Sequence, residues 1–213
     1  MTEVSFKGRF INPNEIRKAT HRSMRRRFVK NVFDGHMPNK LWMIRKTGDK
    51  IHDSLFNFAK KLPAELNVIL HKNKKPIFGN PVYEIRIKHN ELGDVAVLGQ
   101  SHDNYGPKYS LSNLLQETEN LDEISGKDVL MRFINKISQR LVRQIKNSEI
   151  SVPKTKKMIE KLKNFSLNNN VDKKFVETME HNLIEVMNKK YKYAHQKNFL
   201  TRLIIKIRNF FNT

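Results

Sequence analysis

The chain contains no cysteine among its 213 residues. Disulfide bonds, thiolate metal sites and a cysteine nucleophile are therefore excluded, and a reducing compartment suits the protein. Long hydrophobic runs are also missing, since no stretch approaches the ~18–20 apolar residues that span a bilayer. The first residues, MTEVSFKGRF, lack the apolar centre of a secretory signal. We therefore expect a cytoplasmic location.

Acidic residues are scarce: 21 Asp and Glu stand against 41 Lys and Arg, which gives a net charge of +20. The excess lies at the two ends. Residues 1–46 hold 12 basic and 3 acidic residues, residues 47–121 hold 9 of each, and residues 122–213 hold 20 and 9. Charge segregated in this way attracts anions, at the expense of self-repulsion in the folded state. The pattern predicts a polyanionic partner.

The same three segments describe the domain organisation that we expect. Residues 1–46 would form a basic arm and helix, residues 47–121 a neutral α+β core, and residues 122–213 a basic helical region. At this length the chain suits one core domain with a helical extension. An apolar content of 38%, with 13 Phe, is enough to offset the entropy lost on folding.

Residue periodicity predicts an α+β fold with a small antiparallel three-stranded meander and packed helices. A helix should run from about Asn14 to Phe33, after a short strand around Val4 to Ile11. A second helix should be capped by Asp49 and stopped by Pro63. The alternation of apolar and polar residues predicts three strands, at Leu66 to Leu70, Val82 to Lys88 and Asp94 to Leu98.

The rest of the chain is predicted to be mostly helical. Gly99 to Tyr109 has the composition of an ordered loop, and a short helix is expected at 111–119. After Gly126, apolar residues recur every four positions from Val129 to Ile145, which is typical of an amphipathic helix. Pro153 suits the first turn of another helix, and no Gly or Pro follows it, so the remainder should be helical apart from a break near 167–170.

Two lysine- and arginine-rich helices are candidates for nucleic-acid binding. The helix over 14–33 contains three consecutive arginines and one acidic residue. A guanidinium group donates two parallel hydrogen bonds to a phosphate, and a helix fits the major groove of DNA. A solvated surface helix is the alternative interpretation. The expected contact residues are Arg17, Lys18, Arg22, Arg25, Arg26, Arg27 and Lys30, followed by Lys154, Lys156, Lys157, Lys161 and Lys163.

The last turns, FLTRLIIKIRNFF, have the pattern of a basic amphipathic helix. Such a helix can anchor a protein at an anionic membrane surface, although packing against the protein's own core is the commoner role. The residues that would enter the membrane are Phe199, Leu203, Ile204, Ile207, Phe210 and Phe211. A peripheral membrane or host-directed protein that binds a protein partner is therefore the alternative function.

Catalysis has weaker support. Adjacent His and Asp residues occur at His52-Asp53 and at His102-Asp103, and metal-dependent phosphohydrolases use such pairs as ligands. No second ligand pair fixes the spacing, and a structural turn explains the second dipeptide better. The candidate catalytic residues are His102, Asp103 and Glu84, with the imidazole as general base. We expect no metal and no cofactor, and rank a metal-dependent enzyme acting on nucleic acid third, after non-catalytic nucleic-acid binding.

Overall fold

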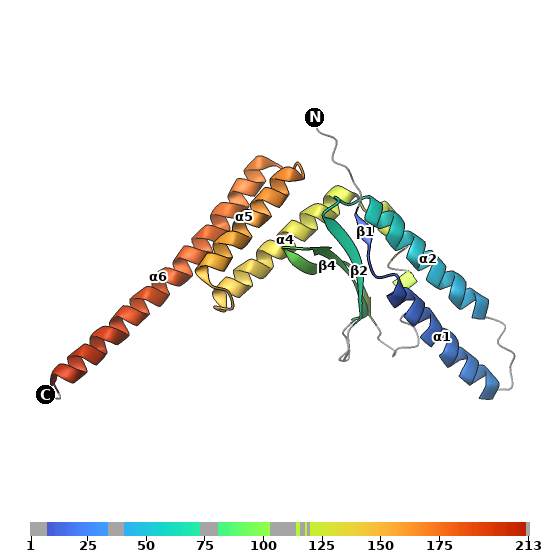
Figure 1. Cartoon of the computed structure of the whole chain (residues 1–213), viewed down its shortest axis with the longest axis horizontal. Helices are drawn as coiled ribbons and strands as arrows, with labels where there is room; N and C mark the ends of the chain where they lie inside the picture. Colours follow the sequence, from blue (N-terminus) through green and yellow to red (C-terminus); the bar gives the residue numbers. More distant parts are fainter. Residues whose placement is uncertain are drawn as a thin grey trace. The chain divides into compact units, whose positions relative to one another are not determined.

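The computed structural model describes residues 8–33, 41–72, 81–102, 114–115, 118 and 120–211 (Figure 1). Its elements are, in order, β1 (Arg9–Phe10), α1 (Asn14–Phe33), α2 (Leu41–Lys60), β2 (Leu66–Lys72), β3 (Pro81–His89), β4 (Gly93–His102), η1 (Asn120–Glu123), α4 (Gly126–Lys146), α5 (Val152–Asn168) and α6 (Lys173–Phe211). This composition confirms the α+β class. The chain divides into two compact units, residues 1–133 and 134–213, with the boundary inside α4.

The sheet has four strands in the order β1-β2-β3-β4 and is mixed. The strands β2, β3 and β4 pair antiparallel, but β1 runs parallel to β2, with Phe10 opposite Val68. The predicted three-stranded antiparallel meander is therefore incomplete, because its three strands pair as expected but the sheet has a fourth strand that runs parallel. A short strand was predicted around Val4 to Ile11, but β1 has only two residues and no alternating pattern that could indicate its partner. The Asn12 amide continues the pairing, since it donates to the Leu70 carbonyl (2.7 Å) and accepts from the Leu70 N–H (2.9 Å).

One face of the sheet is apolar and forms the core of the first unit. The cross-strand pairs Val68–Ile87 and Leu70–Ile85 are fully buried or nearly so. The helices α1 and α2 lie side by side, and both contact β2 (Figure 1). Ile51, Leu55 and Phe58 recur at helical spacing on the buried face of α2, and Leu62, which follows the helix, is buried as well. Burial of this face, at roughly 25 cal/mol per Å² of apolar surface, stabilises the unit.

The second helix begins at Leu41, so the predicted N-cap at Asp49 is wrong. Asp49 lies in the middle of α2, and the glycine before it is also helical. A Cβ atom at Gly48 would overlap the Thr20 hydroxyl of α1, so the glycine allows the two helices to approach closely. Thr20 in turn donates to the Ile16 carbonyl (2.9 Å). Tertiary packing therefore overrides the low helix propensity of glycine, which amounts to about 1 kcal/mol.

The third antiparallel strand is longer than its sequence pattern indicates. The strand β4 continues to His102, which pairs with Pro81 of β3, so the loop predicted from Gly99 is wrong over 99–102. Shifts of register near Glu84 interrupt the alternation on which the prediction depended. Residues 103–109 lie outside the described residues. Of the helix expected at 111–119, residues 114, 115 and 118 are described, and they are helical.

The helices after Gly126 confirm the predicted apolar pattern. All five positions of the four-residue repeat in α4, from Val129 to Ile145, are fully buried. The helix α5 begins after Ser151 with Pro153 in its first turn. It ends where Asn170 adopts a left-handed conformation (φ 55°), a geometry that asparagine tolerates well. Asp172 then accepts the Phe175 N–H (2.8 Å) at the start of α6.

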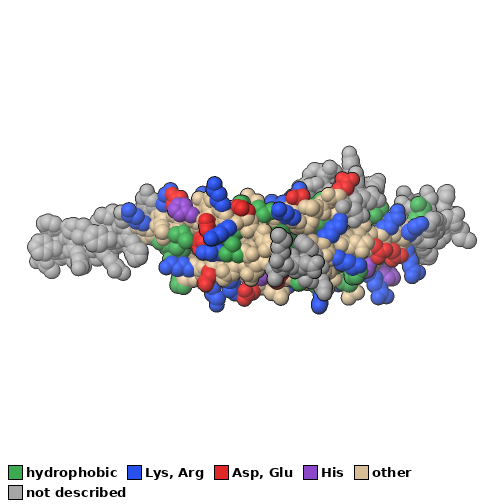
Figure 2. Space-filling view, turned by 90° about the horizontal axis from the view of Figure 1, so that it is seen from above, with side chains coloured by type: hydrophobic (Ala, Val, Ile, Leu, Met, Phe, Trp, Pro, Cys, Tyr) green, Lys and Arg blue, Asp and Glu red, His purple; other side chains and the backbone are tan. Residues whose placement is uncertain are grey.

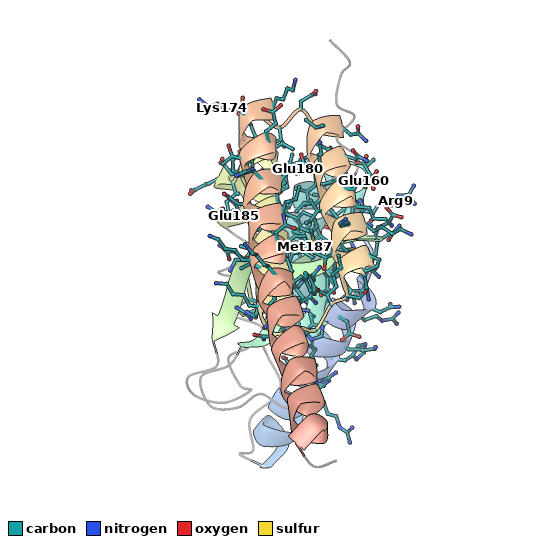
Figure 3. The ribbon with its side chains drawn as sticks, turned by 90° about the vertical axis from the view of Figure 1, so that its left-hand side faces the viewer. Arg9, Glu160, Lys174, Glu180, Glu185 and Met187 are labelled. Carbon is teal, nitrogen blue, oxygen red and sulfur yellow. The ribbon has the colours of Figure 1, made fainter. Side chains whose placement is uncertain are left out.

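The second unit is built from α5, α6 and the C-terminal part of α4. The helices α5 and α6 lie side by side, with Met187 of α6 buried (Figure 3). The other buried apolar residues of this pair include Ile159, Leu162, Phe165, Val176, Met179 and Leu183. At the far end of α4, the Tyr191 hydroxyl donates to the Ile150 carbonyl (2.7 Å), and the Lys190 ammonium donates to the Lys146 carbonyl (2.8 Å).

Candidate nucleic-acid interface

One face of α1 is basic and exposed. Arg17, His21 and Arg25 follow one another at intervals of four residues, and Lys18 and Arg22 lie beside them. All five side chains are exposed, whereas Ile16, Ala19 and Thr20 on the opposite face are buried. Four of these five residues, with Asn14, border a shallow open hollow on the helix surface. We call the residues Arg17, Lys18, His21, Arg22 and Arg25 the α1 basic face.

The cations of this face have little acidic compensation. Lys18 pairs with Glu15 (2.7 Å), but 60% of the lysine side chain remains exposed. Arg17, Arg22 and Arg25 make no ion pair within the part of the chain that the structure describes. On the face of the molecule that Figure 2 shows, Lys and Arg side chains are mixed with acidic ones. The α1 basic face therefore presents guanidinium donors that an external anion can use.

Three further residues predicted for this site are Arg26, Arg27 and Lys30. Their backbone belongs to α1, but their side chains lie outside the described residues. The helix thus extends beyond the α1 basic face by more than a turn, and this extension contains three more cations in sequence.

The second predicted set lies on α5 in the other unit. Lys154, Lys156 and Lys157 are exposed, and Lys161 is partly buried. Lys163 differs from these residues because it pairs with Glu180 of α6 (2.8 Å; Glu180 is labelled in Figure 3). The hydrogen bond and charge of Glu180 raise the pKa of the Lys163 ammonium. Lys163 therefore connects two helices, and its charge is partly neutralised within the protein.

The helix α4 has a basic face that was not predicted as a binding site. Lys136, Arg140 and Arg143 recur with helical spacing along the border of the buried residues, and Lys146 follows them. Lys136, Arg143 and Lys146 are exposed and Arg140 is partly buried. The signal was available, since basic residues spaced by three and four positions accompany the apolar repeat.

Of the three catalytic candidates, Glu84 is the one whose side chain the structure describes. Glu84 accepts a hydrogen bond from Arg86 (2.9 Å), and the same guanidinium binds Asp94 (2.5 Å), so the Glu84 carboxylate belongs to an ion-pair network on the sheet. His102 ends β4, but its side chain and the whole of Asp103 lie outside the described residues. Among the described residues, no cluster of three His, Asp or Glu side chains has the geometry to hold a metal ion.

The helical C-terminus is part of α6, which continues to Phe211. The side chains of the membrane candidates, Phe199, Leu203, Ile204, Ile207, Phe210 and Phe211, lie outside the described residues. Within the described part of the chain, none of the helices combines the length and the hydrophobicity needed to cross a bilayer.

Comparisons of the chain with protein-family models, with curated proteins and with solved structures find no match. The functional interpretation therefore rests on the geometry and the charge of the residues themselves.

Proposed function

We propose that the protein binds nucleic acid without catalysis and with little sequence preference, and that the α1 basic face contacts the phosphate backbone. The observation that carries this proposal is the group Arg17, Arg22 and Arg25, which is exposed on one helix face and has no acidic partner among the described residues. Arginine suits phosphate because its planar fork donates two parallel hydrogen bonds.

The mechanism follows from polyelectrolyte behaviour. Each phosphate that a cation neutralises releases condensed counterions, so affinity falls steeply as salt rises. Contacts to phosphate and sugar carry no direct sequence information, which supports weak sequence preference. The exposed lysines of α5 and the basic face of α4 offer a second set of phosphate contacts in the other unit.

The test is equilibrium binding of the full chain to labelled DNA and RNA, single-stranded and duplex, from low to physiological salt. A variant with Arg17→Glu, Arg22→Glu and Arg25→Glu should lose most of its affinity for every one of these ligands. A control variant with the same change of net charge, at the exposed residues Lys46, Lys50 and Lys174, should lose much less. Equal losses in both variants would show that only the overall charge matters, and would reject α1 as the interface.

Peripheral membrane binding is a second candidate, supported by the continuation of α6 to Phe211 through the basic amphipathic pattern at 199–211. Removal of residues 199–213 should abolish binding to anionic vesicles on this alternative, and leave nucleic-acid binding largely intact on the first. The third candidate is a metal-dependent enzyme that acts on nucleic acid. It predicts that the protein cleaves nucleic acid in the presence of a metal ion, and that His102→Ala abolishes this activity.

A further inference from the structure

A second exposed cluster in the first unit combines aromatic rings with a cation. His52 and Phe56 lie one turn apart on α2 and stack, with ring centroids 6.1 Å apart and ring planes inclined by 10°. Phe10 of β1 meets the His52 ring edge-on at 6.0 Å. The Lys60 ammonium lies 4.3 Å from the centre of the Phe56 ring. We call Phe10, His52, Phe56 and Lys60 the aromatic platform.

The platform is held in place but open to solvent. Phe56 is 46% exposed, so part of its ring surface is accessible to a ligand. His52 is fixed from two sides, because its Nδ1 contacts the Asp53 carboxylate (3.2 Å) and its ring contacts Phe10. Since the rings are already oriented, a flat ligand that stacks on them loses little conformational freedom of the protein.

We propose that the aromatic platform stacks unpaired bases, so that the preferred ligand is a single-stranded nucleic acid. This inference rests on the proposed function and adds a ligand class to it. Single-strand binding proteins combine cations that follow the backbone with aromatic rings on which bases stack. In a duplex the faces of the bases are already stacked on one another, so a platform of this kind favours unpaired strands.

The charges around the platform fit a strand that crosses α2. Lys60 lies four residues beyond Phe56, about 6 Å along the helix. From there its ammonium can leave the Phe56 ring and bind a phosphate of the strand. Arg45 is exposed on the same helix face, seven residues before His52. Asp49 lies on this face between the two and opposes a phosphate, so Asp49→Asn should strengthen binding to single strands.

The test compares Phe56→Leu with Phe56→Tyr in binding to a single-stranded oligonucleotide of mixed sequence, as DNA and as RNA. Leucine keeps an apolar side chain but has no ring, whereas tyrosine keeps the ring. Phe56→Leu should weaken binding about tenfold, from the usual contribution of one stacked base, and Phe56→Tyr should bind as the natural protein does. Binding to an abasic strand of equal length, and to a duplex, should be unchanged by Phe56→Leu.

The outcomes separate this inference from the proposed function. If Phe56→Leu leaves single-strand binding unchanged while charge reversal on the α1 basic face abolishes it, the platform is refuted and the proposed function stands. If the natural protein binds no nucleic acid, both fail. If Phe56→Leu weakens binding to abasic and to normal strands equally, the ring does not stack bases and the inference is overturned. The same holds if sedimentation shows that Phe56→Leu converts a dimer to a monomer, because the cluster would then serve self-association.

Discussion

The salt dependence of binding is the most quantitative prediction that the α1 basic face allows. We consider the replacement of Arg17, Arg22 and Arg25 together by alanine. All three side chains are exposed and alanine is the best helix former, so the variant should fold and melt like the natural protein. Any change in binding can then be assigned to lost phosphate contacts.

The magnitude follows from counterion release. For a single strand, each neutralised phosphate contributes about −0.7 to the slope of log K against log salt, so three contacts contribute about −2.1. Between ~50 and ~200 mM salt, the loss of affinity should therefore be roughly 20-fold smaller in the variant than in the natural protein. Fluorescence anisotropy with a labelled single strand, repeated at several salt concentrations, gives both slopes.

Identical slopes in the two proteins would refute the assignment. A variant that binds more weakly at low salt but keeps the full slope would show that the arginines act indirectly, for example through the position of α1. A melting curve for each protein is the control, because loss of structure also changes the slope.

Three further predictions concern the scaffold. Gly126→Ala places a Cβ against the Lys61 carbonyl oxygen and should reduce the free energy of unfolding by about 1–3 kcal/mol in urea titration; an unchanged midpoint would contradict the close approach. Leu141→Ala, at a fully buried site of α4, should cost about 2–5 kcal/mol by the same assay, and a smaller cost would mean that α4 is not packed as described. Glu180→Gln should lower the melting temperature, because Glu180 raises the pKa of Lys163 and so favours its charged form in the folded state. That contribution is complete below the ordinary pKa of lysine and is lost only as the pH rises through the raised value, so the difference should be constant around neutral pH and shrink in strongly alkaline solution. A difference that changes around neutral pH would contradict this cause.

The parts of the fold that could be predicted are those with strong local signals. The four-residue repeat from Val129 to Ile145 and Pro153 in the first turn of α5 both depend on residues close in sequence, and both were confirmed. The predictions that were wrong concern features whose structure depends on residues distant in the sequence. Gly48 lies inside a helix because Thr20 of another helix approaches it, and β1 pairs with a strand more than fifty residues away.

The candidate site shows the same division. Exposure of Arg17, Arg22 and Arg25 agrees with the basic pattern of their helix, although binding itself stays a prediction. The spacing of His52, Phe56 and Lys60 by four residues is visible in the sequence, but it resembles any surface pattern of a helix. Only the fold brings Phe10 of β1 against His52. This contact shows that the aromatic residues form one cluster in three dimensions and are not merely spaced along one helix.

The most direct test of nucleic-acid binding through α1 is cross-linking of the full chain to a single-stranded RNA, with the attached peptides identified by mass spectrometry. The account predicts cross-links in peptides that contain residues 14–33, and in the peptide around Phe56. Cross-links confined to residues 134–213, or none at physiological salt, would contradict it.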